Sequence, residues 1–454
     1  MSFPRYSEYK NSGFDWLGEV PREWQLKRLG HFFAERRDKV SDKEYQPLSV
    51  TKNGIVPRLE NAAKTQDGDN RKKVLTGDFV INSRSDRKGS SGVSNFDGSV
   101  SLICIVIEPK DISGRFAHHL LRSEVFQEEF YRNGKGIVAD LWSTGFSELK
   151  NIVIPVPSAI EQNQIARFLD HETAKIDSLI HEQECLIELL QEKRQAVISH
   201  AVTKGLDPDV PMKDSGVEWL GEVPAHWSVT KLAHYADILT GYPFPSKGFS
   251  HDDRDVRLLR GANVGVGALK WSDTVYWKLS DRDPLSGFLL KPGQIVFGMD
   301  RPWISEGVRV ARVTEKDVPC LLLQRVASIT PHKGLEENFL YLLLGSDRFK
   351  AYIEPDLTGV SVPHISPEQI LGFKIPLPPQ GEQLGICESV EAELGLNASL
   401  VHEAYQTIDL LRERRSALIS AAVTGKIDVR NWQPPSDESA YDEEVRETGM
   451  EATV

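Results

Sequence analysis

The sequence predicts an α+β protein in which two mixed α/β domains are joined by two long helices. We expect the helices to form an intramolecular antiparallel coiled coil within a pseudo-two-fold repeat. Three observations predict this fold class: a fifteen-residue box that occurs twice, later motifs that repeat in the same order, and two long stretches with helical spacing of apolar residues. A duplicated chain presents two related surfaces, so we expect a target with two parts.

The box spans residues 10–24 and 213–227, where ten of fifteen positions are identical. It reads KNSGFDWLGEVPREW in the first copy and KDSGVEWLGEVPAHW in the second. The later motifs are the EQ segment, IPxPxxxEQ, and a charged stretch that ends in serine: 154–162 with 375–383, and 192–199 with 413–420. The boxes lie 203 residues apart and the later motifs 221 residues apart. The extra 18 residues therefore belong to the second copy, so one frame encloses two different inserts.

Composition bounds the class of protein. The 454 residues are 40% hydrophobic and 26% charged, as in a globular protein of two to four domains. No run of 18 apolar residues occurs, and the first residues lack the apolar core of a secretory signal. The cysteines form no CxxC pair, so we expect neither a zinc site nor a disulfide framework. These features predict a cytoplasmic protein without a membrane segment.

The net charge of −12 argues against a protein that holds nucleic acid alone, because such proteins usually carry a basic surface. Part of this charge is local, since the segment from Asn431 to Val454 contains seven acids and one base. We expect residues 429–454 to form an acidic disordered tail. Local basic clefts remain compatible with a negative net charge, and partner subunits would supply further phosphate contacts.

The order of motifs divides the chain into five segments. We expect a first domain, a first spacer helix, a second domain, a second spacer helix and the tail, at 1–155, 156–205, 206–376, 377–428 and 429–454. Short apolar runs bounded by turn residues predict strands at 74–75, 79–81, 102–107, 289–290, 294–297 and 320–323. Helices are expected at 117–131 and 336–352.

The two long helices carry apolar stripes. From Ile165 onward, steps of four and three residues predict a heptad seam through Leu169, Glu172, Ile176, Leu179, Gln183, Leu186, Leu190, Lys193 and Val197. A weaker seam occupies the equivalent positions of 386–418. Antiparallel packing of the two helices would bury both stripes, and separate packing of each helix on its own domain is the alternative. Glycines at 205 and 425 predict the helix ends.

The duplicated order of the box, the EQ segment and the long helices resembles the DNA-specificity subunit of type I restriction–modification enzymes. The resemblance covers Lys10 to about Asp428. It implies two target-recognition domains, each reading one half of a bipartite DNA site in the major groove, and a coiled coil that sets the gap between the halves. Because the inserts differ, we expect the site to be asymmetric. Type IIB systems use similar subunits, so the class of system stays open.

The resemblance also implies partners. We expect double-stranded DNA, two methyltransferase subunits that dock on the frame, and restriction or translocase subunits. S-adenosylmethionine, ATP and Mg²⁺ are expected on the partner subunits, with adenine N6 as the modified atom. The alternative is a two-headed protein-binding scaffold with a coiled-coil spacer.

No catalytic motif is visible in the sequence. It contains no GxxxxGK[ST] phosphate loop, no HExxH, no GxSxG and no Asn/Asp-Pro-Pro-aromatic motif. We therefore expect a non-catalytic chain that binds no cofactor or metal itself. An enzyme with a cryptic nuclease or methylase site is a further alternative.

DNA contacts are expected from basic and amide side chains in loops, because arginine pairs with guanine edges and lysine or hydroxyl groups with phosphates. Ordinary solvated turns are the alternative for these loops. The candidate residues are Thr51, Lys52, Asn53, Arg84, Arg87, Lys88, Ser90, Ser91, Arg260, Asn263, Arg301 and Trp303.

The frame supplies the candidate docking residues. For the boxed tryptophans, anchoring of the core is weighed against a methyltransferase-docking patch, and the EQ pairs are expected in the first helical turns. The candidates are Trp16, Trp24, Glu161, Gln162, Trp219, Trp227, Glu382 and Gln383.

Overall fold

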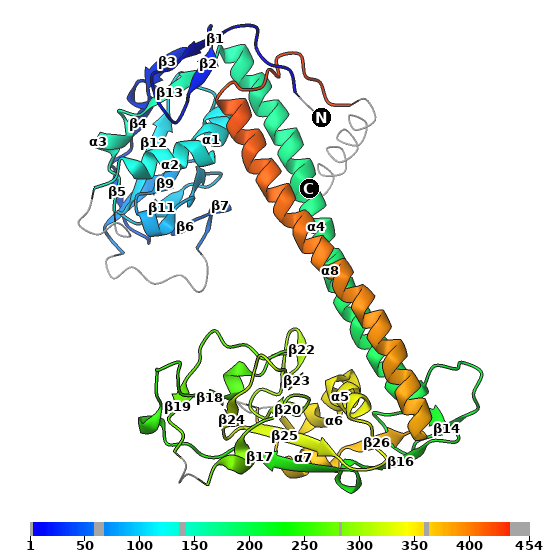
Figure 1. Cartoon of the computed structure of the whole chain (residues 1–454). Helices are drawn as coiled ribbons and strands as arrows, with labels where there is room; N and C mark the ends of the chain where they lie inside the picture. The colour runs from blue at the N-terminus through cyan, green and yellow to red at the C-terminus, as the bar shows by residue number, and fades with distance from the viewer. Residues whose placement is uncertain (1–2, 59–67, 136–141, 281–283, 358–362, 436–454) are drawn as a thin grey trace. The chain divides into compact units, whose positions relative to one another are not determined.

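The computed structural model describes residues 3–58, 68–135, 142–280, 284–357 and 363–435. The chain divides into two compact units (Figure 1). Unit 1 combines Met1–Gln183 with Gln406–Val454, and unit 2 comprises Glu184–Tyr405. The division therefore falls inside the two long helices, whereas the sequence boundaries were placed at their ends. Each unit contains one α/β domain and half of each helix.

Unit 1 is built from short antiparallel strands. Its four-stranded sheet has the order β10-β9-β12-β4, with Ser91–Val93, Phe79–Asn82, Cys104–Pro109 and Phe33–Glu35. A three-stranded sheet has the order β11-β8-β5, with Gly98–Val100, Arg71–Val74 and Lys39–Val40. Three strand pairs complete the unit: β1 and β2 (Tyr9–Asn11, Glu19–Pro21), β3 and β13 (Gln25–Arg28, Val153–Val156), and β6 and β7 (Leu48–Thr51, Gly54–Pro57).

The helices of unit 1 cover one face of the four-stranded sheet. They are α1 (Gly114–Arg122), α2 (Glu124–Arg132), α3 (Phe146–Leu149) and the first half of α4 (Ala159–Lys204). Because side chains alternate along a strand, Ile105 and Ile107 of β12 pack with α1, α2 and α4, whereas Val106 packs with β8 and β11 on the other face. Figure 1 shows α1 and α2 beside strands β9 and β12. Burial on both faces explains the nearly continuous apolar sequence of these strands.

Unit 2 repeats the four-stranded sheet and the helices that follow it, but its remaining strands are arranged differently. Its four-stranded sheet, β23-β20-β25-β17, comprises Val310–Arg312, Ile295–Gly298, Val326–Pro331 and Ala236–Thr240. The three-stranded sheet β19-β18-β24 comprises Tyr276–Trp277, Val256–Leu259 and Cys320–Leu322, with β18 and β24 parallel. The strand pairs are β14 and β15 (Met212–Asp214, Glu222–Pro224), β16 and β26 (Ser228–Lys231, Lys374–Leu377), and β21 and β22 (Trp303–Ile304, Gly307–Val308). The helices are α5 (Glu337–Gly345), α6 (Asp347–Leu357), α7 (Pro367–Gly372) and α8 (Gln380–Val423).

The helices predicted at 117–131 and 336–352 are each two helices. Ser123 has extended backbone angles between α1 and α2, and its hydroxyl accepts a hydrogen bond from Phe126 N. Ser346 separates α5 from α6 with a similar extended backbone. The apolar pattern continues through both breaks, so the sequence pattern alone did not reveal them. The local reason is the serine hydroxyl, which satisfies a donor at the start of the second helix.

Within each unit, the halves of α4 and α8 pack side by side and run antiparallel. In unit 1 the Arg415 guanidinium contacts the Asp177 carboxylate, with Nε 2.9 Å from Oδ1. In unit 2 Lys193 Nζ lies 3.1 Å from Glu393 Oε1, and Asn397 Nδ2 donates to Leu190 O at 2.9 Å. Gly205 and Gly425 end α4 and α8 at φ values of 76° and 75°, as their sequence positions predicted.

The predicted heptad seam of α4 is wrong in the middle of the helix. Leu179 and Leu186 are 37% and 40% exposed, whereas Ile176 and Ile187 are buried. The buried stripe advances by about 3.6 residues per turn, the period of a straight helix, instead of the 3.5 of a strict heptad. The stripe therefore drifts by one position relative to the predicted seam.

The ends of unit 1 differ from the predicted tail boundary. Val429 is buried, and the ring of Trp432 lies 5.2 Å from that of Phe168 on α4. Residues 429–435 are therefore part of the folded unit. The remainder of the predicted acidic tail, 436–454, lies outside the described residues. In the described part of the chain, no helix is long and apolar enough to cross a membrane.

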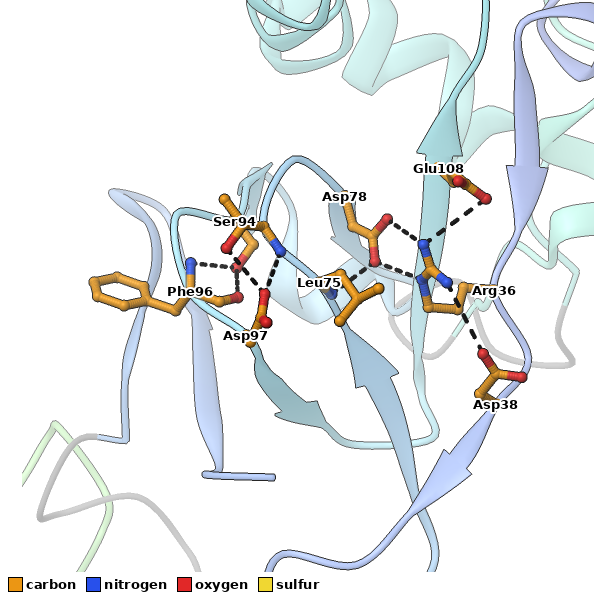
Figure 2. Close-up of polar contacts among 9 residues, drawn as sticks. Arg36, Asp38, Leu75, Asp78, Ser94, Phe96, Asp97 and Glu108 are labelled. Atoms are coloured by element: carbon orange, nitrogen blue, oxygen red, sulfur yellow. Dashed lines mark hydrogen bonds and ion pairs between the residues drawn. The ribbon is translucent and has the colours of Figure 1, made fainter. Parts of the chain in front are cut away.

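A buried ion pair fixes the turn between β8 and β9 in unit 1. Figure 2 shows Arg36 beside the carboxylates of Asp78, Glu108 and Asp38. Arg36 donates to both oxygens of Asp78, with Nε 2.7 Å and Nη2 3.0 Å away, and Asp78 also accepts from Leu75 N at 2.8 Å. This network joins β4, β9 and β12 at the start of β9, and β9 leads at its other end into the loop at 84–91.

Candidate nucleic-acid interface

The box and the EQ segment of each copy meet in the core. In unit 1 Trp24 Nε1 donates to Glu161 Oε1 at 3.0 Å, and the Tyr6 hydroxyl donates to the same oxygen at 2.7 Å. In unit 2 Trp227 Nε1 donates to Glu382 Oε1 at 2.9 Å. Both tryptophans are 1% exposed. The repeated motifs therefore build one framework that is common to the two units.

The glutamine of each EQ segment ties the long helix to the domain. Gln162 Oε1 accepts from Ser113 N, the N-cap of α1, at 2.9 Å. Gln383 Oε1 accepts from Glu336 N, the N-cap of α5, also at 2.9 Å. Both amide nitrogens donate to a proline carbonyl just before the long helix. These bonds fix where the domain helix begins relative to the long helix in each unit.

The structure divides the candidate docking residues into two groups. Trp24 and Trp227 are buried, which favours anchoring of the core as the role of these two boxed tryptophans. Trp16, Trp219 and Glu382 are half-buried, and for them docking stays a prediction. Five candidates are buried, and for them docking likewise stays a prediction: Trp24, Glu161, Gln162, Trp227 and Gln383.

The structure brings together the two candidate loops of the first insert. The loop edge of unit 1 consists of the turn at 51–54, between β6 and β7, and the loop at 84–91, between β9 and β10. Strands β7 and β10 pack side by side, and a Cβ added to Gly89 would lie 3.9 Å from Lys52 Cγ. In the turn, the Thr51 hydroxyl donates to Gly54 O at 3.0 Å and leaves Lys52 and Asn53 exposed at the tip.

A third segment joins this edge, and no sequence motif predicts it. A backbone bridge links Arg84 to Ser143, and Ser143 also bridges Lys135. Ser85 N donates to Trp142 O at 3.0 Å. No local motif marks Lys135 or Ser143, because their approach to the loop at 84–91 depends on the tertiary fold.

The loop edge of unit 1 carries many exposed cations although the whole chain is acidic. Its exposed basic side chains are Lys52, Arg84, Arg87, Lys88 and Lys135. Among the described residues, ion pairs join them to Asp86, Glu128 and Glu148. Lys135 Nζ lies 2.7 Å from Glu148 Oε1 and, with the Ser147 hydroxyl, lowers the pKa of Glu148 to about 2. The cations outnumber these carboxylates, which favours an anionic ligand.

The loop edge of unit 2 consists of the turn at 260–263, after β18, and the segment at 299–303, after β20. Arg309 joins the two parts: Nε donates to Val264 O at 2.8 Å and Nη1 to Asp300 O at 2.9 Å. Arg301 is exposed, and Arg260 pairs with an exposed carboxylate. Trp303 is half-buried and packs against the core.

Asp300 lies at the centre of a polar cluster on this edge. His364 Nδ1 is 2.8 Å from Asp300 Oδ1, and Arg325 Nη1 is 3.0 Å from His364 Nε2. A neutral imidazole that donates from Nδ1 to Asp300 accepts from Arg325 at Nε2. The backbone bridge between Asp300 and His364 occupies the same place in the fold as the bridge between Arg84 and Ser143 in unit 1. The two edges thus share positions but carry different chemical groups.

Two arginines of this edge have left-handed backbone angles. Arg301 has φ of 46° and Arg325 has φ of 71°, a region that disfavours residues with a Cβ. Arg301 N is held by Pro363 O at 2.7 Å, and Met299 N by Arg325 O at 3.0 Å. The sequence pattern points to Arg301 but not to Arg325 and His364, for which no local pattern exists.

Three residues among the predicted DNA contacts have buried side chains, and their contact with DNA stays a prediction. Ser90, Ser91 and Asn263 are 6%, 0% and 2% exposed. Asn263 instead closes the turn at 260–263: its Oδ1 accepts from Arg260 N at 3.1 Å and its Nδ2 donates to Lys270 O at 2.9 Å. Small and polar residues were correctly placed in these loops, but they shape the backbone and do not face outward.

The two edges have the chemistry of a surface that binds an anionic, hydrogen-bonding ligand. Exposed guanidinium, ammonium and amide groups can reach phosphates and base edges. Among the residues that the structure describes, no group of three or more histidines, cysteines or carboxylates is placed to hold a metal ion.

Comparison with known proteins agrees with this arrangement. A family model described as "Type I restriction modification DNA specificity domain" matches residues 21–188 and 285–392. The MjaVIII type I restriction enzyme specificity subunit of Methanocaldococcus jannaschii is 26% identical over 436 residues, which cover 93% of this chain and 98% of that protein. The EcoAI type I restriction enzyme specificity subunit of Escherichia coli is 35% identical over 201 residues, 44% of this chain and 33% of that protein.

A solved structure shares the fold. It comes from work on complex assembly and conformational transition of the type I R-M system, and it superposes with a TM-score of 0.60 at 17% identity. The superposition covers 89% of this chain and 98% of the other.

Proposed function

Because this chain belongs to the type I restriction modification DNA specificity domain family, we propose that it selects the DNA sequence on which a type I restriction–modification complex acts. Each unit reads one half of an asymmetric bipartite site, and its loop edge enters the major groove. The chain itself is non-catalytic. Methyltransferase subunits carry out the modification with S-adenosylmethionine, and restriction or translocase subunits use ATP and Mg²⁺.

One observation carries this proposal: a common framework holds two unlike loop edges. Hydrogen bonds from the box to the EQ segment occur in both units. At the same place on that framework, unit 1 presents Arg84 and Ser143, whereas unit 2 presents Asp300 and His364. Equivalent position supports a shared task, and different donors and acceptors support different base sequences.

We assign the spacing of the half-sites to α4 and α8, acting as an antiparallel coiled coil in a pseudo-two-fold molecule. The helices have 46 and 44 residues. Antiparallel contacts occur in each unit, between Asp177 and Arg415 and between Leu190 and Asn397. A helix pair that is packed in both units is a suitable spacer, because its length is set by the number of residues.

We assign docking of the methyltransferase subunits to the exposed apolar side chains of the same helices. Large exposed apolar residues are a feature of protein interfaces when they gather on one element. On α4 and α8 they are Ile160, Leu179 and Leu410 in unit 1, and Leu186, Leu189, Leu384, Leu396, Leu400 and Tyr405 in unit 2. Exposed parts of Trp16 and Trp219 are a second candidate surface.

The test is sequencing of modified bases in cells that produce this chain with its methyltransferase subunits. We expect two short, dissimilar motifs at a fixed separation, each with a modified adenine. A single continuous motif or a palindrome would overturn the bipartite proposal. Modification that is independent of this chain would overturn its role in selecting the sequence and favour the protein-binding scaffold.

A further inference from the structure

Arg309 connects both parts of the loop edge of unit 2. It lies between β22 and β23, half-buried, with its guanidinium surrounded by backbone carbonyl groups. Nε donates to Val264 O at 2.8 Å, and Nη2 donates to Gly261 O. Nη1 donates to Asp300 O at 2.9 Å and lies 3.5 Å from Arg301 O. The Arg309 side chain thus binds carbonyl groups of both the turn at 260–263 and the segment at 299–303.

The main chain of Arg309 adds two further bonds to the same region. Arg309 N donates to Pro302 O at 2.7 Å, and Gly298 N donates to Arg309 O at 2.9 Å. Backbone and side chain together therefore hold both ends of the segment at 299–303. Without these bonds, the backbone partners described for the segment would be Arg325 O, Pro363 O and Ile365 N, together with the pairing of β21 with β22.

Only a guanidinium can make this set of bonds. It presents five donors in a rigid plane, whereas a lysine ammonium is a compact charge on a flexible stem that reaches fewer carbonyls at once. Bonds from a charged donor to a carbonyl are stronger than neutral ones. Burial lowers the pKa of Arg309, so the contacts with carbonyl dipoles are what keep a charged group acceptable in this position.

Unit 1 has an arginine with a corresponding task. Arg122 at the end of α1 donates from Nη2 to Lys52 O at 2.5 Å, which holds the turn at 51–54. Its Nη1 lies 3.2 Å from His118 Nε2. Arg122 comes from the helix layer and Arg309 from the sheet, so no sequence repeat relates them.

We infer that Arg309 is a positioning residue for DNA recognition by unit 2: it fixes the turn at 260–263 and the segment at 299–303 in one geometry from which Arg301 and its neighbours meet the bases. Arg122 positions the turn at 51–54 in unit 1. This inference rests on the proposed function. It assigns neither arginine a contact with DNA.

The clamp itself is tested without DNA, by hydrogen exchange of the purified full-length chain. Arg309→Lys keeps the positive charge but loses the planar set of donors. Amides at 261–264 and 299–303 should exchange about tenfold faster, whereas those of β20 and α5 should not change. Unchanged exchange at 261–264 and 299–303 would overturn the clamp, whatever the function of the chain.

The matched control is Arg257→Lys. Arg257 also donates to backbone carbonyls, those of Lys316 at 2.9 Å and Val318 at 3.4 Å, but these belong to a different loop. It should shift thermal stability to a similar degree as Arg309→Lys and leave exchange of the loop edge unchanged.

The effect on recognition is measured by sequencing modified bases with each variant in the complete methyltransferase complex. Arg309→Lys should reduce discrimination at the half-site read by unit 2 by about tenfold, because a displaced arginine loses its bidentate pairing with a base. The other half-site should stay unchanged. Arg122→Lys should reduce discrimination only at the half-site read by unit 1, and Arg257→Lys should affect neither half-site.

The outcomes separate the two proposals. Loss of discrimination at both half-sites with Arg309→Lys, or at neither while exchange increases, would overturn the positioning role. A wild-type chain that yields no bipartite motif would instead overturn the proposed function, and the exchange result would still stand.

Discussion

Single residues determine the chemistry of the two loop edges, and several do so through unusual surroundings. Arg301 and Arg325 occupy left-handed backbone regions, and Asp300 accepts from an imidazole that an arginine contacts on its other side. In unit 1, His118 is packed against Arg122 beneath the turn at 51–54. Strained or buried residues of this kind often occur at functional sites, so these positions are candidates for variants that test function.

Replacement of Arg301 by glycine separates backbone strain from function. Glycine accepts φ of 46° without steric cost. Arg301→Gly should therefore leave the free energy of unfolding of unit 2 unchanged or raise it by at most roughly 1 kcal/mol. Selectivity at one half-site should nevertheless fall, because the exposed guanidinium is lost. Thermal melting and sequencing of modified bases measure the two effects. Arg301→Lys, which retains charge and strain, is the control, and full selectivity in the glycine variant would contradict a contact of Arg301 with DNA.

His118 should make unit 1 sensitive to acid. Burial, then the neighbouring Arg122 and His119, lower its pKa from 6.5 to about 3, while Asp170 on α4 acts against this and Arg415 on α8 adds to it. The unfolded chain therefore binds a proton below pH 6.5 that the folded unit does not bind. Stability present above pH 6.5 is lost as the pH falls towards 3, by up to about 1.4 kcal/mol per pH unit.

Hydrogen exchange of α1 amides, corrected for intrinsic rates, measures this loss between pH 7 and pH 5. His118→Gln removes the proton site, so its dependence on pH should be weaker than that of the wild type. Parallel curves for the two proteins would show that other groups control the acid response.

At the scale of secondary-structure elements, the box and the EQ segment make the same hydrogen bonds in both units, whereas other contacts between elements differ. Both units have a tryptophan–glutamate bond and a glutamine that caps the first domain helix. The turn before the central strand differs, however. Asp78 and its partner Arg36 in unit 1 correspond in position to Gln294 and Leu239 in unit 2, where Gln294 Oε1 accepts from Lys291 N at 2.8 Å.

The Arg36–Asp78 pair should contribute to stability only as a pair. Asp78→Ala leaves Arg36 without its main partner and Leu75 N without its acceptor, so the free energy of unfolding should fall by roughly 3 kcal/mol. The double variant Arg36→Leu with Asp78→Gln carries the residues of unit 2 and should recover most of the loss. Hydrogen exchange of β8 and β9 amides is the measurement. A double variant that loses as much stability as Arg36→Leu and Asp78→Gln lose separately, added together, would show that the two side chains are not coupled.

At the scale of the whole molecule, two domains with one framework and unlike loop edges are connected by α4 and α8. The buried stripe of each helix is packed within both units, so a change in one helix alone would shift its contacts with the other. The predicted function depends on this connection, because a bipartite site needs a defined distance between its halves.

Matched insertions test the spacer. Seven residues added to α4 after Gln183 and seven to α8 after Tyr405 lengthen each helix by about 10.5 Å and nearly preserve the facing stripe. The gap between the half-sites should lengthen, by up to about three base pairs, while both half-site sequences stay the same. Sequencing of modified bases reports the gap. A seven-residue insertion in α4 alone is the control and should lower stability; an unchanged gap with full modification in the matched variant would rule out the helices as the spacer.

Features that depend on local pattern follow from the sequence alone. The duplicated box and EQ segment gave the repeat, apolar runs gave the central strands, and glycine gave the ends of α4 and α8. Capping, turn formation and helical periodicity act within a few residues, so they can be predicted without the fold. The same patterns point to Lys52, Arg84, Arg87, Lys88 and Arg301, which are exposed; their contact with DNA stays a prediction.

Which loop residues face outward, and how the helix stripes pack, depends on the tertiary structure. Ser90, Ser91 and Asn263 lie in the expected loops but are buried, and the stripe of α4 drifts from Leu179 and Leu186 to other positions. Arg122 and Arg309 bind carbonyls that are 70 and 48 residues distant in the chain. Such contacts depend on packing between elements that are far apart in sequence, and no local preference of an arginine encodes them.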